Sequence, residues 1–139
     1  MIVLDTNVVS ELTRLVPNGT VLEWLARQPP SELFFTTVSE AELRYGVEIL
    51  PAGRRRATLA ASIERTLRQN FAGRILPFDT DAARTYATIA AARRAAGNAI
   101  GQADCQIAAI ARARGAGVAT RDVAGFSGCG IEVINPWQA

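Results

Sequence analysis

MIVLDTNVVSEL, residues 1–12, carries the strongest indication of the fold. Its apolar run Ile2–Leu4 is typical of a short strand buried on both faces, and the residues that follow predict a helix over residues 8–14. A strand that leads directly into a helix is the first half of a β-α-β unit. Asp5 stands at the junction, where the strand ends, and the stretch as a whole predicts a parallel sheet covered by helices.

The rest of the chain repeats this alternation of short apolar runs and longer helical patterns. Thr37-Val38-Ser39-Glu40 has the form of a capping box, which predicts a helix that begins at residue 37. The predicted strands cover residues 33–36, 75–76, 118–120 and 132–134, and the predicted helices cover residues 21–27, 37–50, 54–70, 80–96 and 103–114. The pattern is that of one α/β domain over residues 1–139.

Composition removes most other kinds of active site. The chain has no histidine and no lysine, and all 15 of its basic residues are arginine. The cysteines, Cys105 and Cys129, form neither a CxxC motif nor a zinc spacing, so we expect two free thiols in a reducing compartment. No apolar run reaches the ~18 residues of a membrane span, and the N-terminus lacks the basic region of a signal peptide, so we expect a cytoplasmic protein.

Two carboxylates follow predicted strands, at the point where each strand ends. Asp5 comes directly after the first strand, and Asp122 follows a later one. Open parallel sheets bind ligands outside the carboxyl ends of their strands, so both acids are expected on the same edge of the sheet. Thr6, Asn7 and Thr120 are expected there as well, where they can orient the carboxylates by hydrogen bonds.

Two further carboxylates lie on apolar stripes of predicted helices. Glu42 shares a helical stripe with Val38, Tyr45 and Ile49, and Asp104 shares one with apolar residues of the helix over residues 103–114. Burying a carboxylate is costly unless a cation or hydrogen-bond donors meet it. We therefore expect Glu42 and Asp104 to join the acids at the edge of the sheet.

Each acid also has an ordinary structural explanation. Asp5 and Asp122 could cap the helices after them, Asp104 could complement a helix dipole, and Glu42 could pair with an arginine. None of these explanations accounts for all four acids at the expected site of one fold. Clustered carboxylates repel one another, and Mg²⁺ or Mn²⁺ bound by their oxygens would remove that repulsion. The chemistry expected of such a site is metal-assisted hydrolysis, with one or two ions.

Arginines near the acids are candidates for binding a substrate phosphate. Arg44 and Arg121 flank Glu42 and Asp122 in sequence and could contact a phosphate, although either could instead pair with Glu42. The run Arg54-Arg55-Arg56 could bind phosphate too, or could be a solvated helix face.

Four segments carry a resemblance to a known family: MIVLDTNVVSEL, TTVSEAELRYGV, QADCQIAAIA and VATRDVAGF. In order and spacing they resemble the motifs of PIN-domain ribonucleases, and more closely those of the VapC-type, FitB-like toxins. The resemblance implies a three-layer α/β/α sandwich and an Mg²⁺- or Mn²⁺-dependent endoribonuclease. It also implies the metal ligands Asp5, Glu42, Asp104 and Asp122, with Thr120, Thr6 and Asn7 supporting them.

The same resemblance implies partners. Members of the family usually form homodimers, and a small DNA-binding antitoxin holds them inactive and can place an arginine in the acidic pocket. The complex commonly binds operator DNA through the antitoxin. The resemblance does not identify the RNA substrate.

Three other kinds of protein are alternatives to this interpretation. Haloacid-dehalogenase-type phosphatases require a second aspartate where this chain has Asn7, and both they and phospho-receiver domains require a lysine that is absent. A catalytically silent binding module, which uses the acidic pocket only to hold an arginine-bearing partner, is compatible with the sequence.

Overall fold

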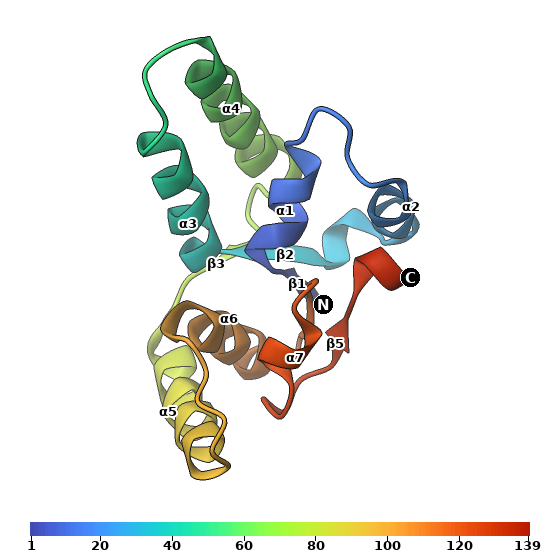
Figure 1. The fold of residues 1–139 in the computed structure, drawn as a ribbon. Helices are drawn as coiled ribbons and strands as arrows, with labels where there is room; N and C mark the ends of the chain where they lie inside the picture. Colours follow the sequence, from blue (N-terminus) through green and yellow to red (C-terminus); the bar gives the residue numbers. More distant parts are fainter.

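The computed structural model describes all 139 residues and contains a five-stranded parallel sheet (Figure 1). The strand order is β3-β2-β1-β4-β5, so the first strand of the chain is the central one. The strands are β1 (Ile2–Leu4), β2 (Leu33–Thr36), β3 (Ile75–Leu76), β4 (Gly117–Ala119) and β5 (Val133–Ile134). The predicted parallel sheet is therefore confirmed, and all neighbouring strands pair in parallel.

Seven α-helices surround the sheet. They are α1 (Thr6–Leu12), α2 (Gly19–Arg27), α3 (Thr37–Glu48), α4 (Arg54–Arg65), α5 (Thr80–Ala95), α6 (Gln102–Ala113) and α7 (Val123–Phe126). A π-helical segment, Thr66–Asn70, extends α4, and short 3₁₀ segments lie at Pro30–Glu32 and Pro136–Gln138. No helix has both the length and the apolar character needed to cross a membrane.

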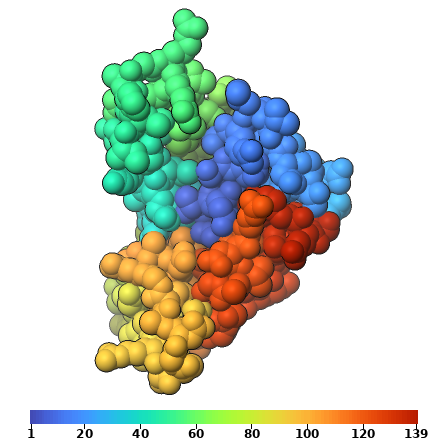
Figure 2. Space-filling model, in the orientation of Figure 1, coloured from blue at the N-terminus to red at the C-terminus, as the bar shows by residue number.

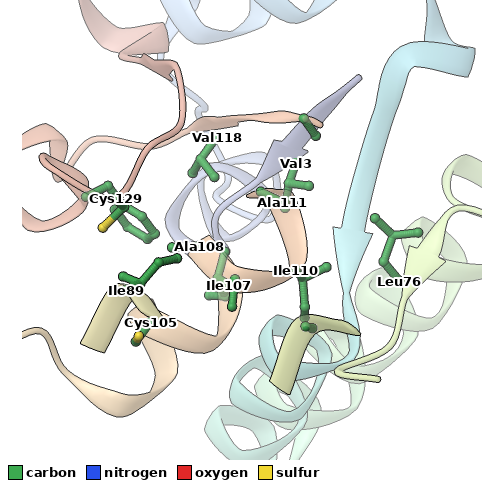
Figure 3. Packing of buried hydrophobic residues seen from close by; sticks show 14 residues of the cluster. Val3, Leu76, Ile89, Cys105, Ile107, Ala108, Ile110, Ala111, Val118 and Cys129 are labelled. Atoms are coloured by element: carbon green, nitrogen blue, oxygen red, sulfur yellow. The ribbon is translucent and has the colours of Figure 1, made fainter. Parts of the chain in front are cut away.

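Two hydrophobic cores, one on each face of the sheet, make this a three-layer α/β/α arrangement. Val3 and Leu4 are both fully buried, but Val3 joins the core formed with α5 and α6, whereas Leu4 joins the core formed with α1 to α4. Successive residues of a strand point to opposite faces, so one short strand serves both cores. Figure 3 shows the α5–α6 core, where Ile89, Ile107 and Val3 pack together.

Two predicted helix starts and one predicted cap differ in the structure. Helix α2 begins at Gly19, not residue 21, because Asn18 caps it, whereas α3 begins at Thr37 as predicted. Helix α1 begins at Thr6, not residue 8, because Asp5 already caps it by accepting a hydrogen bond from the Thr6 N–H. The capping residue of α3 is Thr36 and not Thr37, since the Thr36 hydroxyl accepts from the Ser39 N–H at 3.0 Å. Asp5, directly after β1, and Thr36, the last residue of β2, each cap the next helix, so the chain turns at the carboxyl edge with no intervening loop.

Candidate functional site

The four acids come from segments that meet at the carboxyl edge of the sheet. Asp5 follows β1 directly, Glu42 lies on α3 just after β2, and Asp122 follows the end of β4. Because β1 lies between β2 and β4, these three acids emerge from adjacent strands. Asp104 is in the first turn of α6, and since α6 leads back into the start of β4, its first turn lies at the opposite, carboxyl edge.

Asp5 is the most enclosed of the four acids, with an exposed fraction of 6%. Its Oδ1 accepts a hydrogen bond from the Thr6 N–H at 2.8 Å, and its Oδ2 accepts from the Thr120 hydroxyl at 2.8 Å. Burial raises the pKa of Asp5 from 3.8 to about 6, and repulsion by Asp104 and Glu42 adds to the rise against those hydrogen bonds. Asp5 therefore carries a charge that its surroundings destabilise, which is a property of cation-binding carboxylates.

The Thr120 hydroxyl connects three parts of the site. It donates to Asp5 and accepts from the Asp122 N–H at 3.0 Å and from the Asn7 side-chain amide at 3.3 Å. Asn7 also donates to Asp5 Oδ2 at 3.3 Å. The predicted supporting residues Asn7 and Thr120 thus orient Asp5 and fix the backbone at Asp122.

Thr6 connects Asp5 to Glu42. Its hydroxyl lies 2.8 Å from Glu42 Oε1 and 2.8 Å from the Ser39 hydroxyl. An ionised carboxylate has no proton to give, so the single Thr6 proton goes to Glu42 and Ser39 donates to Thr6. Ser39 is fully buried and was not among the predicted site residues. Its position three residues after the strand-end Thr36, and three before Glu42, was the available signal.

The prediction that Glu42 lies on a buried apolar stripe is wrong. Tyr45 and Ile49, which share its stripe, are 59% and 66% exposed, and Glu42 itself is exposed. The buried face of α3 carries Leu43 and Val47 instead. Helix α3 packs through a narrow stripe, so the neighbouring stripe with Glu42 faces out beside the acidic site.

Neither flanking arginine pairs with Glu42. Arg44 binds Glu40 and Glu64, and the guanidinium of Arg121 stacks over the Trp137 ring at 5.2 Å. The backbone N–H of Arg121 donates to Asn7 Oδ1 at 3.4 Å, which places this residue at the rim of the site.

Asp104 and Asp122 form the other half of the site. Asp104 is half-buried, and its pKa is raised by burial first and then by repulsion from Asp122 and Glu42. Asp122 is exposed and caps α7 through the Gly125 N–H, 3.1 Å from Oδ1. A Cβ atom at Gly125 would lie 2.3 Å from Asp122 Oδ2, so only glycine permits this capped arrangement. Asp5 and Asp122 thus both act as helix caps at the carboxyl edge of the sheet.

The donor set fits a hard divalent cation but is not already closed around one. All four candidate ligands are carboxylates, the ligand type preferred by Mg²⁺ and Mn²⁺. Asp104 and Glu42 raise the pKa of Asp5 by repulsion, and Asp122 and Glu42 raise the pKa of Asp104 in the same way. The charges of the four acids therefore influence one another. No three acidic or cysteine side chains are grouped closely enough to hold a metal ion as they stand.

Replacing Thr120 by valine tests the role of its hydroxyl. Thr120→Val keeps the shape of the side chain but removes one of the three donors to Asp5 and leaves the Asp122 N–H without its acceptor. We expect the free energy of unfolding to fall by about 1–3 kcal/mol, as for other buried groups that lose their partners. Chemical denaturation measures this loss, with Thr88→Val, an exposed threonine on α5, as the control. A loss no larger than that of the control would contradict the connecting role of Thr120.

Comparisons with known proteins find matches along almost the whole chain. A model of the PIN domain matches residues 2–127. The VapC ribonuclease Y4jK of Sinorhizobium fredii is 46% identical over 138 residues, and Toxin FitB of Neisseria gonorrhoeae is 41% identical over 138 residues. Each alignment covers 99% of both chains. A solved structure of FitAB bound to a DNA fragment matches with a TM-score of 0.92 and 40% identity, over 99% of this chain and 96% of the other.

Proposed function

Because this chain belongs to the PIN-domain family, among its VapC and FitB members, we propose that it is a metal-dependent endoribonuclease that acts as the toxin of a toxin–antitoxin pair. Its 139 residues form a single PIN domain in this proposal. The observation that carries it is the meeting of Asp5, Glu42, Asp104 and Asp122 at one edge of the sheet, in a chain without histidine or lysine.

The four carboxylates are the proposed metal ligands. Asp5 is the most firmly oriented, because three hydrogen-bond donors fix its two oxygens. Glu42 is held by Thr6, and Asp122 is held by the turn of α7. Mg²⁺ or Mn²⁺ bound there would activate water and stabilise negative charge on the phosphate. The hydrogen-bond donors around the site orient the four carboxylates. The negative charge of the carboxylates favours a bound cation and disfavours the anionic phosphates of RNA.

The proposed partners are a small DNA-binding antitoxin and a second copy of this chain. The Neisseria relative is named a toxin, and its complex FitAB is solved on DNA, which supports an antitoxin that carries the pair to operator DNA. Leu15 and Val16, between α1 and α2, are highly exposed and offer an apolar seat for a partner segment. Tyr45 and Ile49 offer another beside the site, where a second copy could pack. The proposed location is the cytoplasm, where RNA is available.

RNA must be attracted by groups outside the acidic site, since the carboxylates repel its phosphates. Arg44 is held by two glutamates, which leaves Arg121 at the rim as the better placed of the two predicted phosphate contacts. A larger basic surface lies between α1 and α4, where a cleft of about 890 Å³ is lined by Arg14, Arg54, Arg55 and Arg65 with several hydroxyl groups. Helix α1 begins directly after Asp5, and its Ser10 lines this cleft, so one RNA strand could reach both. Figure 2 shows the blue N-terminal segment next to the green segment that contains α4.

Removing two of the cleft arginines should weaken RNA binding in a salt-dependent way. Arg54 and Arg55 form no ion pair in the structure, so their charges are available to phosphates. The double variant Arg54→Gln, Arg55→Gln should bind labelled single-stranded RNA several-fold more weakly at low salt, and the slope of log affinity against log salt should fall by about 1.4. Fluorescence anisotropy in EDTA measures binding without cleavage. Arg27→Gln with Arg94→Gln, two exposed arginines elsewhere, is the matched control, and an equal loss in both pairs would contradict a specific role for the cleft.

The proposed function is tested by cleavage of total bacterial RNA by the purified, antitoxin-free protein. Reactions contain Mg²⁺, Mn²⁺ or EDTA, and new RNA ends are mapped by sequencing. Metal-dependent cuts at defined positions support the proposal and identify the RNA target. No cuts with either metal would overturn it and favour the silent binding module, whose acidic pocket would then be tested for binding to an arginine-bearing peptide.

A further inference from the structure

A buried arginine outside the acidic site lies at the end of α5. Arg93 is only 6% exposed, and none of the ion pairs in the structure includes it. Backbone oxygens surround its guanidinium instead: Nε donates to Asn98 O at 2.7 Å, and Nη1 donates to Ser127 O at 2.7 Å and to Gly125 O at 3.0 Å. Burying an unpaired charge is costly, so an apolar residue would fill this space at lower cost if packing were the only need.

The bonded oxygens belong to the two segments that carry half of the candidate site. Asn98 lies in the connection from α5 to α6, three residues before the helix cap Gly101 and six before Asp104. Gly125 and Ser127 belong to α7 and its end, and the Gly125 N–H is the group that holds the Asp122 carboxylate. One rigid guanidinium therefore bonds to the entry of the Asp104 helix and to the turn that holds Asp122.

The two segments need such a connection. The chain from Ser127 to Glu132 forms neither helix nor strand, so regular secondary structure does not fix the far end of α7. The planar fork of an arginine can hold several oxygens at fixed angles, which the single ammonium of a lysine cannot do.

We propose that Arg93 is a positioning residue that sets the placement of Asp104 relative to Asp122. The inference rests on the proposed function for the meaning of those two acids, but its geometry is independent of any reaction. Arg93 touches neither acid; it acts through the carbonyl groups of Asn98, Gly125 and Ser127.

The test compares Arg93→Met and Arg93→Lys with the control Arg94→Met at the next position on α5. The side chain of Arg94 is exposed and makes no hydrogen bond or ion pair in the structure. Arg93→Met removes the fork and retains much of the side chain's volume. In folded Arg93→Met we expect kcat for RNA to fall at least tenfold with little change in KM, and direct titration should show at least fivefold weaker Mn²⁺ binding. Hydrogen exchange should rise in residues 98–104 and 122–129 together. Arg94→Met should match the wild type in all three measurements.

A purely structural arginine would give a different result. Folded Arg93→Met with a lower melting temperature, but with wild-type kcat, Mn²⁺ affinity and exchange in the two segments, would overturn the proposal. If Arg93→Met does not fold, Arg93→Lys decides, because it keeps the charge and loses the fork; wild-type values in that variant would also overturn it. If the wild type cleaves no RNA, the proposed function fails, while Mn²⁺ binding and hydrogen exchange still decide the role of Arg93.

Discussion

Asp5→Asn should reduce RNA cleavage by at least about 10³-fold while leaving the protein folded. The amide has nearly the same shape but no charge, so it cannot take part in binding a divalent cation as a carboxylate does. Losing the several kcal/mol with which such a site stabilises charge in the transition state corresponds to three or more powers of ten in rate. Single-turnover cleavage of a mapped RNA target, with Mg²⁺ and with Mn²⁺, measures the loss.

Glu40→Gln is the matched control for Asp5→Asn. Glu40 lies on α3 two residues before Glu42, but it binds Arg44 and is not among the proposed ligands. Its removal should change the cleavage rate by no more than about twofold, and surface ion pairs of this kind contribute little to stability. Cleavage by folded Asp5→Asn within tenfold of the wild type would contradict the role of Asp5 as a ligand.

Without divalent cations, the protein should lose stability as the pH rises from about 4 to 6. The pKa of Asp5 is about 6 in the folded protein and 3.8 as its reference value, because burial disfavours the charged form. Between these values the folded state binds more protons than the unfolded state, so the free energy of unfolding falls with rising pH. The difference in pKa corresponds to roughly 3 kcal/mol, present below pH 4 and lost above pH 6.

Denaturant unfolding at pH 4, 5, 6 and 7 in EDTA measures this dependence. Asp5→Asn should show a flatter profile, because its amide does not titrate. Mg²⁺ at millimolar concentration should restore part of the lost stability at pH 7, since a ligand that binds only the folded state stabilises it. Equal profiles for Asp5→Asn and the wild type would show that another group causes the pH dependence.

Much of the fold was predictable because short apolar runs and helix caps are local signals. Ile2–Leu4 was recognisable as a buried strand. Asp5 and Asp122 each follow the end of a strand, and the rule that ligands bind at the carboxyl ends of parallel strands was enough to place both acids at one edge of the sheet. The hydroxyl of Thr120 was predicted to orient a carboxylate, and it bonds Asp5 in the structure. That four acids share one edge follows from the order of strands and helices.

Other features depend on tertiary contacts that spacing does not reveal. The apolar residues beside Glu42 suggested burial, but which stripe of α3 faces the core is set by its packing on α1 and α4, and the stripe with Tyr45 and Ile49 faces solvent. Ser39 and Arg93 were missed because their partners, Thr6 and the carbonyls near α7, are far away in sequence. A serine or arginine in a helix gives no local indication of such a contact.

Titration of the metal-free protein with Mn²⁺ tests most directly the central claim that the four acids form one cation site. Calorimetry would compare the wild type with Asp5→Asn, Asp104→Asn and the control Glu40→Gln at pH 7. The account predicts saturable binding to the wild type and to Glu40→Gln, and binding at least tenfold weaker in both aspartate variants, although they lie on different segments. No Mn²⁺ binding by the wild type, or equal binding by all four proteins, would contradict it.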